Sequence, residues 1–287
     1  MGHMRIVAGR TIMKKMLLLC AGLLLAAGIT SAEVVSTNIV GYTTAPTIKA
    51  DSYTMLGVNF EAVDIESGVG TPLYEYFAEQ IPGTFKGGMV ESVADRILVP
   101  KESGDGYDNY FFYSNLAVVG TPYEWMHNAW LTPTMQLATR PLYSGMSVFF
   151  DSREDLDLSG FILKGQVTQI PSFDFEIQEG FSMFASPFPI DFDLNSKSNL
   201  WTGVKGGLVE SASDRILVPK ESGDGYDNYF FYSNLAVVGT PYEWMHNAWL
   251  TSSMQLAPPI PAGVAAWFDR QELAGNTIVT LKKPYLD

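Results

Sequence analysis

The chain has 287 residues, of which 18 are Lys or Arg and 31 are Asp or Glu, so its formal net charge at pH 7 is −13. A field of this sign repels nucleic acid and anionic lipid and favours divalent cations, so we exclude nucleic acid as a partner. Apolar residues make up 47% of the chain and there is one cysteine, which indicates a globular protein stabilised by packing and not by disulfides.

The first 32 residues have the pattern of a secretory signal peptide. Four basic residues precede an apolar run at residues 16–29, and the small residues Thr30-Ser31-Ala32 follow. The run is shorter than the roughly 20 residues that a bilayer-spanning helix needs. We therefore expect cleavage after Ala32, no membrane span in the mature protein, and a secreted, extracellular or cell-surface location, with the periplasm as an alternative. Cleavage removes the cysteine and four basic residues, which leaves 14 Lys and Arg against 31 Asp and Glu, or −17.

The mature sequence reads as a series of short strands. In chain order we expect a leading strand at Tyr53–Phe60, a hairpin from Asp95 to Tyr113, either a helical turn or a strand at Tyr123–Trp130, and a further strand at Ser144–Asp151. No segment of ten or more residues has a convincing helical apolar stripe, and a short helix is an open alternative at Pro72–Gln80 only. Pro100 has no amide hydrogen for a β-ladder and should lie at a strand end. Turn-forming residues separate these segments throughout. The sequence therefore predicts an all-β protein of sandwich or barrel type.

One segment of the chain occurs twice. Residues Lys86–Ala138 recur as Lys205–Ala257, 119 positions later, with five differences in 53 positions. The flanks match less closely, with residues 144–151 similar to 262–269 and 53–60 similar to 181–188. A long self-match at one offset is typical of two copies of a structural unit. Beyond the signal peptide at 1–32, we therefore expect a first β repeat unit at 33–165 and a second at 166–287, related by duplication and packed against each other.

These motifs also carry a resemblance to a known group of proteins. The segments are the Asp-x-Ile-Leu-Val hairpin at Asp95–Val99, the Ser-Gly-x-Ser-Val-Phe-Phe strand at Ser144–Phe150, the closing strand at Gly160–Val167 and the mature start at Val35–Tyr42. In these four segments the chain resembles a loosely defined group of secreted tandem β-repeat proteins from environmental bacteria. The resemblance implies export and an all-β architecture. It transfers no catalytic or binding residue, because the members are mostly uncharacterised.

Aromatic residues are the main candidates for ligand binding. In each copy three rings follow the hairpin closely, and the six residues are Tyr123, Trp125, Trp130, Tyr242, Trp244 and Trp249. Together with the aromatic run at Tyr107–Tyr113, these rings either pack on both sides of a buried strand or form a flat, exposed aromatic surface. A flat surface would stack on sugar rings or dock on a neighbouring protein.

The acidic turn of the hairpin is a candidate calcium site, because calcium prefers carboxylate and carbonyl oxygens. The residues are Glu102, Asp105 and Asp108, with Glu221, Asp224 and Asp227 in the second copy. The alternative is a solvated turn in which Gly and Asp supply the backbone angles. His127 and His246 are flanked by tryptophans, and we interpret them as packed or surface imidazoles and not as catalytic or metal-binding groups.

The sequence has none of the common catalytic motifs, and we expect a protein that is not an enzyme. The first hypothesis is a structural or adhesive protein of the cell surface or extracellular matrix that self-associates or contacts an extracellular protein. The alternative is a carbohydrate-binding module that uses the paired aromatic residues. A second alternative is a calcium-stabilised secreted binding protein; otherwise no cofactor is expected.

Overall fold

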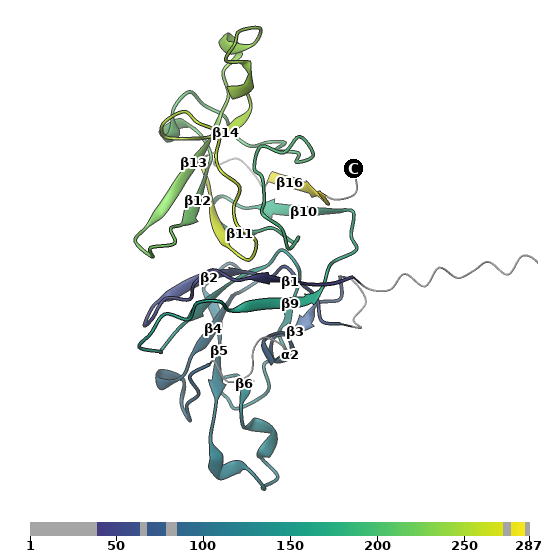
Figure 1. The fold of residues 1–287 in the computed structure, drawn as a ribbon, viewed down its shortest axis with the longest axis vertical. Coiled ribbons are helices and arrows are strands. Elements are labelled where there is room, and N and C mark those ends of the chain that lie inside the picture. Colours follow the sequence, from purple (N-terminus) through teal and green to yellow (C-terminus); the bar gives the residue numbers. More distant parts are fainter. Residues whose placement is uncertain (1–38, 64–67, 79–84, 272–276, 285–287) are drawn as a thin grey trace, which may run out of the picture. The chain divides into compact units, whose positions relative to one another are not determined.

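Strands dominate the structure, and the prediction of an all-β fold is confirmed (Figure 1). The computed structural model describes residues 39–63, 68–78, 85–271 and 277–284, and the expected signal peptide at 1–32 lies outside them. The strands of the N-terminal half are β1 (Val40–Thr44), β2 (Tyr53–Gly57), β3 (Thr71–Pro72), β4 (Arg96–Pro100), β5 (Tyr107–Tyr113), β6 (Ala129–Leu131), β7 (Pro141–Leu142), β8 (Ser147–Asp151) and β9 (Ile162–Gln166). Those of the C-terminal half are β10 (Ser172–Ile177), β11 (Gly180–Ala185), β12 (Arg215–Pro219), β13 (Tyr226–Tyr232), β14 (Ala248–Thr251), β15 (Ala265–Arg270) and β16 (Thr277–Lys282).

Helical structure is limited to short segments. The described residues contain one α-helix, α2 (Leu73–Ala78), which lies inside the segment where the sequence leaves a short helix open. The 3-10 helices are η1 (Glu91–Val93), η2 (Leu116–Val118), η3 (Glu124–Met126), η4 (Glu210–Ala212), η5 (Leu235–Val237) and η6 (Glu243–Met245). Within the described ranges no helix has the length and apolar character needed to cross a bilayer.

Each half contains a five-stranded antiparallel sheet, and the two sheets have the same strand order. The order is β2-β8-β4-β5-β6 in the N-terminal half and β11-β15-β12-β13-β14 in the C-terminal half. In addition β1 pairs with β9, and β10 pairs with β16. The strand that closes the first half, β9, ends at Gln166, and the unit boundary at residue 165 stays a prediction from the sequence. The origin of the halves by duplication stays a prediction from the sequence.

The predicted hairpin is formed by β4 and β5, and its counterpart by β12 and β13. Ile97 and Val99 are fully buried and alternate with partly buried neighbours, as expected for a strand with one face on the core. Pro100 ends β4, where its missing amide costs no ladder bond. Gly104 and Gly106 have φ angles of 77° and 85°, a backbone conformation that glycine adopts without strain, so the turn depends on them.

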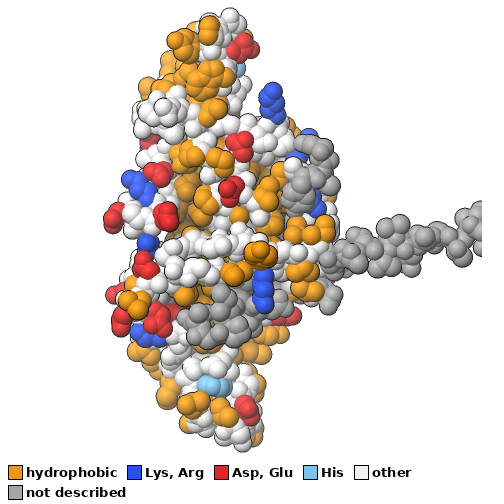
Figure 2. Space-filling view, viewed as in Figure 1, with side chains coloured by type: hydrophobic (Ala, Val, Ile, Leu, Met, Phe, Trp, Pro, Cys, Tyr) orange, Lys and Arg blue, Asp and Glu red, His pale blue; other side chains and the backbone are white. Residues whose placement is uncertain are grey.

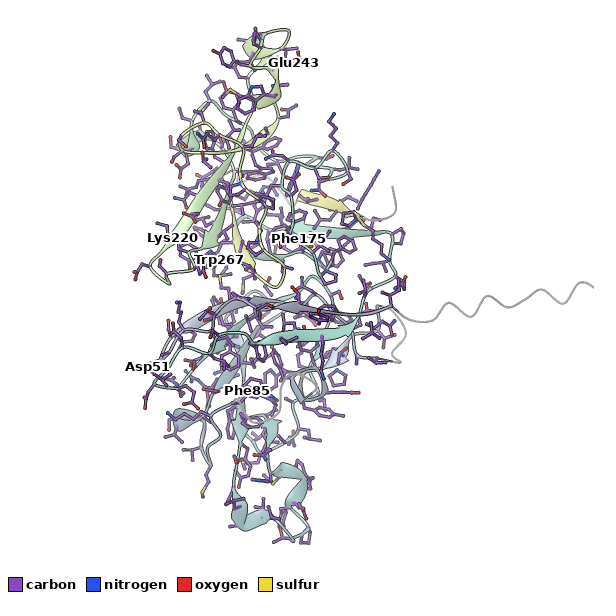
Figure 3. The ribbon with its side chains drawn as sticks, viewed as in Figure 1. Asp51, Phe85, Phe175, Lys220, Glu243 and Trp267 are labelled. Atoms are coloured by element: carbon purple, nitrogen blue, oxygen red, sulfur yellow. The ribbon has the colours of Figure 1, made fainter. Side chains whose placement is uncertain are left out.

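Aromatic side chains fill the core of each half. In the N-terminal half Trp130 is 1% exposed and its ring centroid lies 5.3 Å from that of Phe85 and 5.4 Å from that of Phe112 (Figure 3 labels Phe85). In the C-terminal half Trp249 is fully buried against Phe231 and Trp201. Each ring removes on the order of 150–250 Å² from water, which makes these clusters the main source of stability in a chain without disulfides.

The two halves pack against each other, as expected. Residues 38–287 form one compact unit. Met55 of β2 lies in a small apolar cluster with Ala185 and Ala265 of the C-terminal half. Asn59 donates a hydrogen bond from Nδ2 to the carbonyl oxygen of Ser186 at 2.6 Å. Buried side-chain bonds of this kind fix the register of one half against the other.

Candidate functional site

Each sheet carries a loop that connects its last two strands. The first tip is defined as Ser114–Asn128, between β5 and β6, and the second tip as Ser233–Asn247, between β13 and β14. In Figure 1 each loop shows as short coiled turns at the end of its strands. Small apolar clusters, which include Met126 in the first half and Met245 in the second, anchor the tips to their sheets.

Apolar side chains project from both tips into solvent. Leu116 is 79% exposed and Trp125 48%, and their counterparts Leu235 and Trp244 are 80% and 49% exposed. The other exposed members are Val119 and Tyr123 in the first tip and Val238 and Tyr242 in the second. Figure 2 shows hydrophobic side chains gathered over the end of the second half, around the second tip. Contiguous exposed apolar surface on a soluble protein commonly marks an interaction site.

The polar side chains of the tips bond to the tip's own backbone. The amide of Ala117 donates to Asn115 Oδ1 at 2.9 Å, and that of Gly120 donates to Glu124 Oε2 at 3.1 Å. The amide of Asn115 donates to His127 Nδ1 at 3.2 Å. The second tip has the same bonds with lengths of 2.9, 3.0 and 3.2 Å. The loops are therefore held in a fixed shape, and mainly apolar groups remain to meet a partner.

The structure separates the aromatic residues that the sequence groups together. Tyr123, Trp125, Tyr242 and Trp244 lie on the tips and are exposed. Trp130 and Trp249 lie in β6 and β14 and are buried in the cores, so they present no surface to a ligand in this structure. His127 and His246 accept hydrogen bonds from backbone amides inside the tips.

The acidic turns lie at the far end of the same hairpins. Glu102 pairs with Arg140 at 2.9 Å, and Asp105 is exposed. Asp108 is in β5, while Glu221, Asp224 and Asp227 occupy the equivalent places beside and in β13. Among the residues that the structure describes, no group of three or more His, Cys, Asp or Glu side chains is placed to hold a metal ion. Calcium binding at these turns stays a prediction.

Two grooves lie where a hairpin turn of one half meets the other half. The first groove, of about 380 Å³, lies between the turn at residues 100–107 and strands β10, β11 and β15. The second groove, of about 650 Å³, lies between the turn at residues 218–227 and the segment 44–55. Figure 3 labels Phe175 and Trp267 on the first groove and Lys220 on the second. The sequence does not indicate the grooves, because their walls come from both halves.

No protein-family model, curated protein or solved structure matches this chain.

Proposed function

We propose that the chain is an exported, non-enzymatic adhesive protein that self-associates through its two apolar tips. The observation that carries the proposal is the matched exposure of four apolar side chains on each of two hydrogen-bonded loops. A rigid loop that exposes Leu and Trp keeps apolar surface in contact with water in the free protein, which is unfavourable. The free energy falls when a partner covers these side chains.

The charge of the chain favours a second copy as the partner. Within residues 114–128 the one formally charged residue is Glu124, whereas the whole chain carries −13. Two such acidic molecules repel each other over most of their surfaces, and the repulsion is weakest where neutral surface meets neutral surface. The tips are such surfaces, so tip-to-tip contact is the approach with the smallest electrostatic cost.

The size of a tip predicts a weak individual contact. The exposed parts of Leu116, Val119, Tyr123 and Trp125 offer on the order of 400 Å² of apolar surface, given about 150–250 Å² for a whole aromatic side chain. Two facing tips then bury about 800 Å² in total, less than the roughly 1,200 Å² of a standard stable interface. Since each chain has two tips, self-pairing produces open-ended assemblies whose growth depends on concentration.

Sedimentation velocity on residues 33–287 tests the proposal with variants of one tip or both. The first-tip variant carries Leu116→Ser and Trp125→Ser, and the second-tip variant carries Leu235→Ser and Trp244→Ser. We expect wild-type assemblies that grow with concentration, dimers from either single-tip variant because one tip remains, and monomers when both tips are changed. Added salt should strengthen wild-type assembly by screening the repulsion between acidic chains.

Leu156→Ser is the matched control, because Leu156 is 80% exposed but lies outside both tips. This variant should assemble as the wild type does. A wild-type chain that stays monomeric at all concentrations, or single-tip variants that grow beyond dimers, would refute self-association through the tips.

A further inference from the structure

The first groove contains two buried hydroxyl groups without a hydrogen-bond partner. Ser144 and Ser147 line the groove and are each 5% exposed, and neither Oγ atom has a partner within the described structure. Ser144 precedes β8, and Ser147 is its first residue. A buried hydroxyl that forms no bond costs on the order of 1–3 kcal/mol, so this pair needs a reason to be present.

The second half of the chain shows that the fold does not require these hydroxyls. Its residues Ala262 and Ala265 occupy the positions that match Ser144 and Ser147 in the sequence Ser-Gly-Met-Ser against Ala-Gly-Val-Ala. Both alanines are buried, and the glycine between them has a positive φ in both halves, 93° at Gly145 and 80° at Gly263. The same local backbone therefore forms with alanine, and the serine hydroxyls are an addition specific to the first groove.

Aromatic rings form much of the remaining wall of the first groove. Phe181 is exposed and lies edge-on to Trp267, with ring centroids 6.2 Å apart. Tyr107 and Phe175 also line the groove, and Figure 3 labels Phe175 and Trp267. Rings of this kind provide flat apolar faces for a ligand to stack on. The counterpart of Trp267 in the first half, Phe149, contacts Trp267 at 6.0 Å, so the ring is fixed in place by the other half.

The polar lining points to a ligand rich in neutral hydroxyl groups. A serine hydroxyl both donates and accepts, and it pairs best with a group that does the same. Two carboxylates, Glu102 and Glu176, and one ammonium group, Lys101, also line the groove, so negative charge is in excess there. Carboxylates accept hydrogen bonds from hydroxyls and repel anions. Sugars combine such hydroxyls with an apolar ring face that stacks on aromatic side chains.

We propose that the first groove binds a neutral glycan, with sugar rings against Trp267 and Phe181 and sugar hydroxyls bonded to Ser144 and Ser147. A volume of about 380 Å³ is near the lower end of ligand sites, so the groove takes one or two sugar rings. The site is independent of the tips, because it shares no residue with either tip.

Isothermal titration of residues 33–287 with neutral oligosaccharides tests the proposal. The panel contains cello-, malto-, xylo-, manno- and chito-oligosaccharides of two to four rings, with an oligogalacturonate as the acidic comparison. We expect at least one neutral member to bind and the oligogalacturonate not to bind. The variant Ser144→Ala with Ser147→Ala, which gives the first half the residues of the second, should weaken binding at least tenfold without lowering Tm, because the change removes unpaired hydroxyls.

The first-tip variant Leu116→Ser with Trp125→Ser is the matched control, and it should bind the same sugar as tightly as wild type. The proposal fails if no neutral member binds, if the double alanine variant binds unchanged, or if the acidic sugar binds most tightly. Unchanged binding by the double alanine variant would show that the two hydroxyls bond to water only. Each of these results leaves the assembly measured by sedimentation unaffected, so failure here is distinct from failure of tip association.

Discussion

Asp95 is a buried carboxylate next to β4, and it should make the stability of the fold depend on pH. The residue is 1% exposed, and both of its oxygens accept backbone hydrogen bonds of 2.7 Å, from the amides of Lys86 and Arg153. Burial raises the pKa of Asp95 from 3.8 to about 6, and the two backbone bonds only partly oppose this change. Burial also raises the pKa of Asp214, which bonds to Lys205 and Gln271 in the second half.

The direction of the effect follows from proton binding. Between pH 3.8 and about 6 the folded chain holds a proton on Asp95 that the unfolded chain releases. Folding is therefore favoured at the acidic end, and this contribution is lost as the pH rises through 6. A shift of about 2 units corresponds to about 3 kcal/mol of unfolding free energy, since one unit is worth about 1.4 kcal/mol.

The variant Asp95→Asn removes this titration and keeps the shape of the side chain. Its amide oxygen still accepts one backbone bond, but its NH₂ group cannot accept the other, so we expect the variant to be less stable than wild type at pH 4. As the pH rises to 7, the stability of the variant relative to wild type should improve by up to about 3 kcal/mol. Urea unfolding followed by tryptophan fluorescence, repeated at pH 4, 5, 6 and 7, measures the difference.

Comparison with wild type at each pH cancels the titration of every other group. Asp214→Asn should change stability in the same direction with pH, because burial raises the pKa of Asp214 as well. A difference between Asp95→Asn and wild type that stays constant from pH 4 to pH 7 would refute the reasoning, because the Asp95 carboxyl would then titrate alike in the folded and unfolded chains.

Two further predictions concern the tryptophans and the acidic turns. Trp130→Ala should lower the unfolding free energy by about 3–5 kcal/mol by emptying the core, while Trp125→Ala on the first tip should cost much less, and urea unfolding of both variants checks the contrast. Calcium binding at the acidic turns predicts a higher Tm in excess calcium than in excess chelator, since an ion bound only to the folded state must stabilise it, and Asp105→Asn with Asp108→Asn should abolish the difference. A Tm that is the same in calcium and in chelator would contradict calcium binding at these turns.

The all-β fold and the hairpins were predictable because their signals are local. The Asp95–Tyr113 segment combines β-branched residues, a Gly- and Asp-rich turn and an aromatic run, and all three act within one hairpin. The sequence left open whether Tyr123–Trp130 forms a helical turn or a strand, and the structure contains one of each. Glu124–Met126 forms a 3-10 turn, and Ala129–Leu131 forms β6.

The roles of the aromatic residues were not predictable from the sequence alone. Trp125 and Trp130 are five residues apart and have the same chemistry, but one is on a tip and the other is in the core. Their burial is decided by how β6 pairs with β5 and covers the sheet, which is a tertiary property. The grooves depend on contacts between halves and were also out of reach. The sequence does show that Ala262 and Ala265 stand where the first copy has Ser144 and Ser147. This difference could have pointed to the first groove.

The division between copied and diverged segments accounts for the two kinds of site that we propose. Residues 114–128 and 233–247 are identical, so a contact made entirely by a tip must occur twice in each chain. Each groove has one wall from a copied hairpin turn and another from the diverged flanks, so its chemistry need not be repeated. The unpaired serine hydroxyls accordingly occur in one groove only. On these two proposals, a chain built in this way would join two neighbours through equivalent tips and would hold a single glycan at a site that leaves both tips free.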